Sequence, residues 1–360
     1  MRDLLYRHEP PRYERGPYSD GSFSMDFSRV TLLLGAPRSG TSWIGKIFDS
    51  HPDVLYRHEP DLALWEQKLP FLVLPEQTAT YSGLARDYLD RLIRTPTLKA
   101  SGQLPVFPKA YAFPGVQTAR AAMIHGLRWL EAVSGRRGLR AAPIPDLFRL
   151  ESYPPLRVVM KSVSALGRSR ILLEAMPQAR FIFIMRHPCG QIGSMLRGQR
   201  QGRFESGLFI KEALRIPLAR RYGLTEADLD RASESARRAW VWVLMNEFAL
   251  EAFAGRENAR IVIYEDVCED PLARAREMFS FSHLPWHEQT ETFIRHSTTH
   301  SGKERYYGVL RNAVASANKW RTELNQQDQE TIRQIVRQTS LAQYWPDIAE
   351  SVPDKQLTSA

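Results

Sequence analysis

The chain has 360 residues, of which 43% are hydrophobic and 25% charged, the composition of an ordinary globular protein. Its formal net charge of +9 favours an anionic ligand or an anionic surface as a partner. A nucleic acid is not favoured, because the sequence contains no long basic run and no zinc-finger, RRM, KH or basic-zipper pattern.

The compartment is predicted from what the sequence does not contain. No apolar stretch is long enough for a transmembrane helix, and the charged, proline-bearing N-terminus has no apolar core of the kind found in secretory signals. Cys189 and Cys268, the only cysteines, form neither a disulfide framework nor a zinc pattern. We therefore expect a cytoplasmic protein that needs no metal.

The chain begins with a lead-in, residues 1–28, that is rich in proline, charge and tyrosine and is predicted to be irregular. A domain over residues 29–345 and a polar tail, 346–360, are expected to follow. The lead-in contains Leu5–Pro10, which repeats Leu55–Pro60 letter for letter. We have no physical account of this repeat.

The first predicted strand, Val30–Leu34, leads into a loop bounded by Gly35 and Gly40 and then into a helix that begins at Thr41. A strand, a small-residue loop and a helix N-terminus together favour anion binding, because free N–H groups and the helix dipole meet there. The spacing is close to that of a Walker A loop, GxxxxGK[ST], but Thr41 stands in place of the lysine and the cation is Arg38. A phosphate site and an ordinary turn with a chance arginine both remain open here.

The helix is predicted to end near Ser50, where His-Pro-Asp-Val interrupts it, and Leu55–Pro60 follows. The whole stretch, GAPRSGTSWIGKIFDSHPDVLYRHEP, resembles the start of the sulfotransferases that use 3′-phosphoadenosine 5′-phosphosulfate (PAPS), most closely their carbohydrate and bacterial branches. The resemblance implies that the loop holds the 5′-phosphosulfate and that Glu59 is the general base, with His58 as the nearest rival. It assigns the donor's 5′ end to the following residues: Arg38, Ser39, Gly40, Thr41, Ser42 and Trp43.

A long insertion, residues 61–156, precedes the next strand. Helical patterns over 82–93 and 117–133 are separated by prolines, so the segment is predicted to mix helix and loop. Its position in the chain suggests a cap over the acceptor.

Two further strands are predicted, at 156–160 and 179–185, the second ending at Arg186-His187-Pro188 where another helix begins. Since open α/β sheets bind ligands at the carboxyl ends of their strands, Arg186 and the 35–42 loop are expected at one edge. Ser194 stands eight residues after Arg186. The family resemblance implies that Arg186 and Ser194 hold the 3′-phosphate, and that Lys161 contacts the sulfonate or bridging oxygen. The alternative for Lys161 is a strand-end lysine facing water.

Residues 200–255 are predicted to be helical, with a long apolar stripe over 231–253, and a last strand covers 259–264. Asp270-Pro271 is typical of a helix N-terminus. A polar segment, 296–321, resembles the family loop that closes over the nucleotide. It makes Trp320 and Arg321 candidate donor contacts, although a surface loop with a packed tryptophan is equally open. A final helix is expected near 327–338.

These features together predict an α/β fold with three layers: a mostly parallel central sheet of four to five strands, helices on both faces, and a P-loop NTPase-like topology. The predicted function is transfer of the sulfuryl group from PAPS, as co-substrate, to an acceptor hydroxyl on a carbohydrate or small-molecule alcohol. A carboxylate would take the acceptor's proton while Arg38, the loop N–H groups and Lys161 stabilise the leaving oxygen. The rivals are a P-loop kinase or NTPase, which would need a Walker lysine, and a non-catalytic nucleotide binder. The sequence specifies neither the acceptor nor the oligomeric state.

Overall fold

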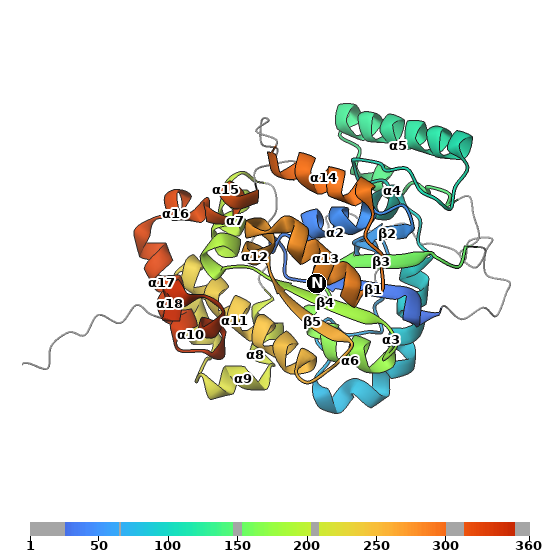
Figure 1. Ribbon diagram of the computed structural model, residues 1–360. Helices are drawn as coiled ribbons and strands as arrows, with labels where there is room; N and C mark the ends of the chain where they lie inside the picture. Colours follow the sequence, from blue (N-terminus) through green and yellow to red (C-terminus); the bar gives the residue numbers. More distant parts are fainter. Residues whose placement is uncertain (1–25, 65, 147–152, 203–208, 300–312, 350–360) are drawn as a thin grey trace, which may run out of the picture. The chain divides into compact units, whose positions relative to one another are not determined.

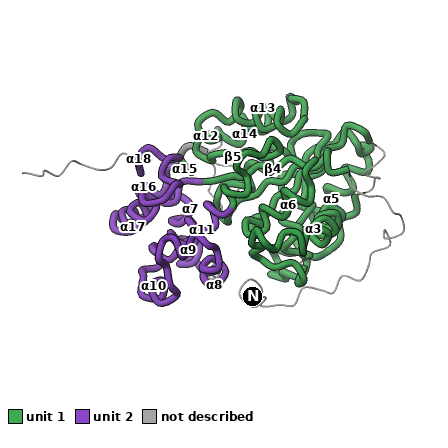
Figure 2. The backbone as a smooth tube through the Cα atoms, turned by 90° about the horizontal axis from the view of Figure 1, so that it is seen from below, with its two compact units in different colours: residues 1–185, 249–317 green, residues 186–248, 318–360 purple. Residues whose placement is uncertain are grey.

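The computed structural model describes residues 26–64, 66–146, 153–202, 209–299 and 313–349. These residues form two compact units, distinguished by colour in Figure 2. The first contains the described residues up to 185 and those of 249–317; the second contains those of 186–248 and those from 318 onward. The first hexapeptide copy, most of the lead-in and of the tail, and the 300–312 part of the predicted closing loop lie outside the described residues.

The first unit is built on a five-stranded sheet in the order β2-β3-β1-β4-β5, with every neighbouring pair parallel. This confirms the predicted sheet and places the strand that feeds the glycine loop at its centre. The chain leaves β1 toward β2 on one side and leaves β4 toward β5 on the other, so their carboxyl ends form a topological switch point. The strands are β1 (Val30–Leu34), β2 (Val54–His58), β3 (Arg157–Ser162), β4 (Arg180–Met185) and β5 (Ala259–Ile263).

One face of the sheet packs on α2 (Thr41–Asp49), α12 (Tyr264–Glu269), α13 (Pro271–Phe281) and α14 (Glu288–Thr299). Leu33, Val159 and Ile182 from three strands pack there against Ile47 and Phe279 from the helices. Side chains alternate along a strand, so Lys161, opposite Leu33 in the register, points to this same face.

Helices α3 (Thr78–Ile93) and α6 (Ser169–Ala175) lie on the other side of the sheet (Figure 1). Phe183 also points to this side, and its ring lies 5.5 Å from that of Phe253 at the end of α11 (Glu234–Phe253). Both faces are therefore covered, which explains why β1 is buried along its whole length and contains only apolar residues and one threonine.

The insertion contains α3, α4 (Leu98–Ser101) and α5 (Pro114–Ser134), and two of these coincide with the predicted helical patterns. It is attached to β2 by Arg57, whose side chain is fully buried. The Arg57 guanidinium donates to the Ile93 carbonyl at 2.7 Å and the Ser101 hydroxyl at 2.8 Å, and pairs with the Asp146 carboxylate. The strand that ends at Glu59 is thus held to three separate parts of the insertion.

The second unit is helical. Trp242 of α11 donates to Gln191 of α7 at 3.0 Å, and Glu247 accepts from the backbone and hydroxyl of Ser340. Its other helices are α7 (Pro188–Arg200), α8 (Ile210–Leu214), α9 (Pro217–Arg221), α10 (Glu226–Arg231), α16 (Trp320–Glu323), α17 (Gln326–Arg337) and α18 (Pro346–Ala349).

The prediction of a loop over 296–321 is wrong at both ends. Helix α14 continues to Thr299, α15 (Ala313–Asn318) follows the undescribed residues, and Trp320 and Arg321 open α16. The polar composition of the segment did not indicate these helices, because they are stabilised by the packing of a few buried residues such as Trp320. None of the described helices is both long and apolar enough to cross a lipid bilayer.

Candidate active site

The loop between β1 and α2 leaves no room for side chains at its glycines. A Cβ on Gly35 would lie 2.6 Å from the Ser39 hydroxyl and 2.8 Å from the Ile184 carbonyl oxygen. Gly40 caps α2 with a left-handed φ of 92°, and a Cβ there would lie 2.1 Å from the Tyr264 ring. Arg38 also has a left-handed φ, 71°, which costs energy in a residue that is not glycine. The loop is therefore a tight turn that requires glycine at both of these positions.

The N-terminus of α2 is open to an anion. Gly40 provides no side-chain cap, so the first N–H groups of the helix are not satisfied by the protein's own cap. The Ser39 hydroxyl is buried and has no hydrogen-bond partner among the described residues. Thr41 is buried and Ser42 half-buried at the first turn. This is the arrangement that binds phosphate and sulfate groups at helix N-termini.

Trp43 supports this turn from the core. Its indole N–H donates to the Ser297 hydroxyl at 3.1 Å, and its ring lies edge-on to Tyr264 at 6.2 Å. Only 4% of Trp43 is exposed. The predicted contact between Trp43 and the donor stays a prediction, because the contacts recorded for its side chain are with Ser297 and Tyr264 of the protein itself.

Glu59 lies where β2 ends and is the best-positioned carboxylate. Its φ of 49° is left-handed, and its N–H donates to the Lys161 carbonyl at 2.8 Å. One carboxylate oxygen pairs with the Lys161 ammonium and the other with the Lys99 ammonium at 2.6 Å. A residue held in this costly conformation by two cations and a backbone bond has a fixed orientation, as catalytic residues require.

Lys161 connects this carboxylate to the anion loop. Its side chain is 1% exposed, which rules out the alternative of a lysine facing water. The ammonium lies against Glu59 and 3.4 Å from the Ser42 hydroxyl at the first turn of α2. Glu59 as the candidate base, the Lys161 ammonium and the N-terminus of α2 therefore form one cluster.

The charges in this cluster shift the pKa values of its members. Burial by itself would raise the pKa of Glu59, but the nearby charges of Lys161 and Lys99 outweigh it and hold that pKa well below its usual range. Burial, reinforced by Lys161, lowers the pKa of His58 well below its usual value, so the imidazole is neutral. His58 hydrogen-bonds to the Tyr56 hydroxyl at 3.0 Å, which makes it a buried partner of Tyr56 and a weaker candidate for the base than Glu59.

Two members of the cluster could not be found from the sequence. Lys99 is a lone lysine in α4, far along the chain from Glu59, and carries no motif. Asp61 is buried and accepts hydrogen bonds from Ser162 at 2.5 Å and from Ser164. Burial raises the pKa of Asp61, against the effect of these hydrogen bonds. Asp61 thus fixes the end of β3, which carries Lys161.

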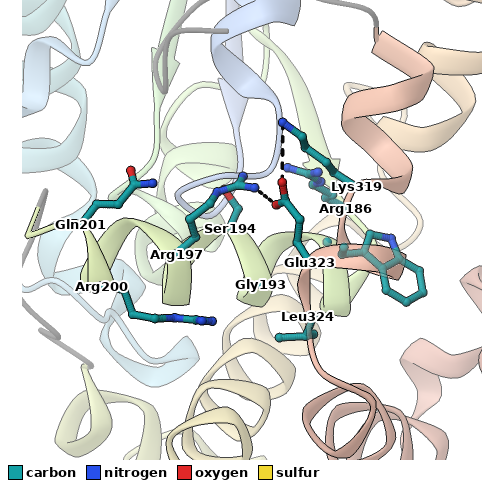
Figure 3. Close-up of a pocket in the computed structure, with 11 residues that line it drawn as sticks. Arg186, Gly193, Ser194, Arg197, Arg200, Gln201, Lys319, Glu323 and Leu324 are labelled. Carbon is teal, nitrogen blue, oxygen red and sulfur yellow. Dashed lines mark ion pairs between the residues drawn. The ribbon is translucent and has the colours of Figure 1, made fainter.

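The second unit contains a separate cationic pocket, drawn in Figure 3. Arg186 and Ser194, the predicted 3′-phosphate pair, both line it, together with Trp320. Trp320 stacks on His187 with ring centres 4.4 Å apart, and a Cβ on Gly190 would lie 3.1 Å from both Trp320 and Arg186. Arg321 does not line this pocket; its guanidinium lies 4.5 Å from the Trp320 ring centre.

The same pocket holds cations that the sequence did not identify. Arg197 and Lys319 both pair with Glu323, as the dashed lines in Figure 3 show, the Lys319 pair at 3.6 Å. A carboxylate thus occupies the position among these cations that an anionic ligand would take.

Comparison with known proteins identifies the family to which these features belong. A model described as "Sulfotransferase family" matches residues 31–288. The chain belongs to the sulfotransferase family. The predicted activity, sulfuryl transfer from PAPS, is thereby confirmed, and the rival NTPase function is not supported.

Relatives of this sulfotransferase include carbohydrate sulfotransferase 1 of Rattus norvegicus, 24% identical over 335 residues, with 87% of this chain and 77% of the relative covered. Carbohydrate sulfotransferase 7 of Mus musculus is 24% identical over 384 residues, with 89% of this chain and 76% of the relative covered.

Solved structures similar to this sulfotransferase include the sulfotransferase domain of the Synechococcus PCC 7002 olefin synthase, with 19% identity, a TM-score of 0.39, and 85% of this chain and 94% of that chain covered. A mouse sulfotransferase complexed with PAP has 12% identity and a TM-score of 0.41, with 90% of this chain and 89% of that chain covered.

A comparison of two glycine substitutions tests the role of the loop. Gly40→Ala should weaken binding of 3′,5′-adenosine bisphosphate by about tenfold or more, because the new Cβ meets the Tyr264 ring and displaces the helix N-terminus, which loses at least one charge-assisted hydrogen bond. Gly135→Ala is the control, since Gly135 has a φ of 66° but open space around it. It should cost only about 1–2 kcal/mol of stability. Calorimetric titration and thermal unfolding measure both; equal affinities in the two variants would contradict this role.

Proposed function

We propose that this sulfotransferase uses Glu59 as the general base for a hydroxyl acceptor, and that the α2 N-terminus, Arg38 and Lys161 hold the sulfonate end of PAPS. The observation that carries the proposal is the Glu59–Lys161–Ser42 cluster. A sulfonate seated at the start of α2 would reach Lys161, and Lys161 is already in contact with the carboxylate.

The reaction is an in-line displacement at sulfur. The acceptor oxygen forms a bond to sulfur while the bond from sulfur to the 5′-phosphate oxygen breaks, and the electron pair of that bond stays on the phosphate. The proton of the acceptor hydroxyl passes to the Glu59 carboxylate. Negative charge grows on the leaving phosphate oxygen, and Arg38, Lys161 and the N–H groups at the start of α2 can stabilise it. The products are the sulfated acceptor and 3′,5′-adenosine bisphosphate.

The ion pairs of Glu59 bear on when it can act as a base. A carboxylate held by two ammonium groups is a weak proton acceptor. The donor brings negative charge to the start of α2, where it competes with Glu59 for Lys161. Weakening of that ion pair raises the basicity of Glu59, so that the bound donor itself prepares the base.

Arg186 and Ser194 are proposed to hold the 3′-phosphate, with Trp320 beside them. A guanidinium and a hydroxyl suit a phosphate oxygen pair, and ATP has no phosphate at that position. For the acceptor we propose a carbohydrate hydroxyl, on the strength of the relatives named carbohydrate sulfotransferase.

The first test of the base is Glu59→Gln. Turnover with PAPS and a carbohydrate acceptor should fall about 10²-fold or more, the usual cost of losing a general base. Affinity for 3′,5′-adenosine bisphosphate should stay within a few-fold of wild type by calorimetry. Glu76→Gln, at an exposed carboxylate in the 61–156 insertion, is the control and should keep full turnover. Turnover of Glu59→Gln close to wild type would transfer the role to Asp61 or His58.

The pH profile tests the electrostatics of the same group. Lys99→Met removes one cation from Glu59 and so raises the pKa of that carboxylate, which must be deprotonated to accept a proton. The acid limb of kcat/KM should therefore move to higher pH. Lys68→Met, an exposed lysine, should leave the limb in place. An acid limb that does not move in Lys99→Met would show that Glu59 is not the titrating base.

The 3′-phosphate site is tested by comparing two nucleotides. Arg186→Ala should weaken the binding of 3′,5′-adenosine bisphosphate by roughly 10- to 100-fold, the value of one charge-assisted hydrogen bond. It should change the affinity for AMP much less, because AMP has no 3′-phosphate. Arg220→Ala, an exposed arginine of the same unit, is the control. An equal loss of affinity for both nucleotides in Arg186→Ala would contradict the assignment of Arg186 to the 3′-phosphate.

A further inference from the structure

Helix α5 of the insertion presents an apolar stripe to solvent. Trp129 and Val133 are each 67% exposed and lie one turn apart. The stripe continues toward the helix N-terminus through Ala122 and Ala119, which are also exposed. Phe113, directly before the helix, is 82% exposed. An apolar surface of this kind on a protein usually marks a contact with a partner or a membrane.

The charged side chains of α5 do not lie on this stripe. Arg128 donates to the carbonyls of Gly102 and Leu98, both at 2.9 Å, and pairs with Glu131. Arg120 points to the Ser101 and Pro145 carbonyls. The opposite face of the helix packs through Ile124, which is fully buried. The apolar stripe therefore lies on the outer face of the helix, beside the exposed His125, while the charged side chains of α5 are engaged elsewhere.

Positive charge is concentrated around this helix. Residues 91–145 contain nine lysines and arginines and one acidic residue, Glu131, so they account for +8 of the formal net charge of +9. Most of these cations pair with groups elsewhere in the first unit. Arg136 and Arg137, which follow α5 directly, are exposed, and no ion pair of either is recorded within the described part of the chain.

We propose that α5 is a membrane-docking helix, which inserts Trp129 and Val133 into the interface of an anionic bilayer while Arg136 and Arg137 bind lipid phosphates. Interfacial helices combine these features: an apolar face containing tryptophan, with arginines beside it. Anionic headgroups would supply counter-charges for Arg136 and Arg137.

Two other occupants fit the surface less well. A second copy of this chain docked through α5 would bring only arginines and the engaged Glu131 to the contact, so Arg136 and Arg137 would find no acidic partner. A soluble acidic polysaccharide would satisfy the arginines, but Val133, Ala122 and Ala119 of the stripe offer its hydroxyl groups no hydrogen-bond partners.

The proposal also has a structural link to the active site. Arg128 of α5 holds the carbonyls of Leu98 and Gly102, which flank Lys99 in and after α4, and Lys99 contacts Glu59. A bilayer bound to α5 would therefore lie on the part of the insertion that reaches the base.

Vesicle co-sedimentation of the full chain tests docking without donor or acceptor, so its result is independent of the proposed chemistry. Wild type should bind phosphatidylcholine vesicles that contain phosphatidylglycerol and bind pure phosphatidylcholine vesicles more weakly. Trp129→Ser/Val133→Ser and Arg136→Gln/Arg137→Gln should each weaken binding about tenfold or more. Arg220→Gln/Arg221→Gln, an exposed pair at the end of α9, is the matched control and should bind like wild type.

The thermal unfolding midpoint of each variant must match that of wild type. If a variant of the stripe is destabilised, Ala122→Glu takes its place, because it puts a charge on the exposed stripe without disturbing the helix. Absence of binding, or binding unchanged in both α5 variants, would overturn the proposal. So would a dimer in the absence of vesicles that Trp129→Ser/Val133→Ser dissociates. Heparin binding that depends on Arg136 and Arg137 while vesicles are not bound would assign the surface to an acidic polysaccharide instead.

Discussion

Glu59 and Lys161 form an ion pair where β2 and β3 end, almost out of contact with water. Removing two charges from water is costly, and the pair persists because backbone hydrogen bonding, Lys99 and the Ser42 hydroxyl surround it with partners. The parallel register of β2 and β3 brings the two residues together. The sheet thus places a carboxylate and a cation beside the one helix N-terminus that follows its central strand.

The two candidate anion sites share a physical property. In the first unit Lys161 and Lys99 pair with Glu59; in the second Arg197 and Lys319 pair with Glu323. Clusters of cations repel one another, and a carboxylate among them lowers that repulsion while no substrate is bound. An anionic substrate then gains affinity only to the extent that it binds the cations better than the resident carboxylate does. This selects ligands that carry more than one negative charge.

Much of the fold was predictable because local patterns determine it. The apolar, partly β-branched run Val30–Leu34 was predicted to be a buried strand, although periodicity alone does not separate such a run from a buried helix, and the glycines at 35 and 40 indicated the loop. Arg38, Glu59, Arg186 and Ser194 were predicted because the short motifs that contain them resemble those of the PAPS-dependent sulfotransferases. Lys99 was not, since it reaches Glu59 from a segment without a motif and only the tertiary fold brings it there. Asp61, Arg197 and Lys319 stand close to motif residues in the chain, but the sequence does not show which side chains they contact. Trp320 was assigned to a loop because its surroundings are polar, whereas its buried ring stabilises a short helix.

The buried guanidinium of Arg57 limits how this sulfotransferase can diversify. Insertions at the edge of a sheet usually vary freely, since their removal leaves the core intact. Here, an exchanged insertion that lacked the Ile93 carbonyl, the Ser101 hydroxyl or the Asp146 carboxylate would leave the buried guanidinium of Arg57 without one of its partners. Arg57 lies only two residues before Glu59, so the candidate base would be disturbed as well. A chimaera with a new acceptor segment would therefore have to inherit these three partners, or replace Arg57 by an apolar side chain at the same time.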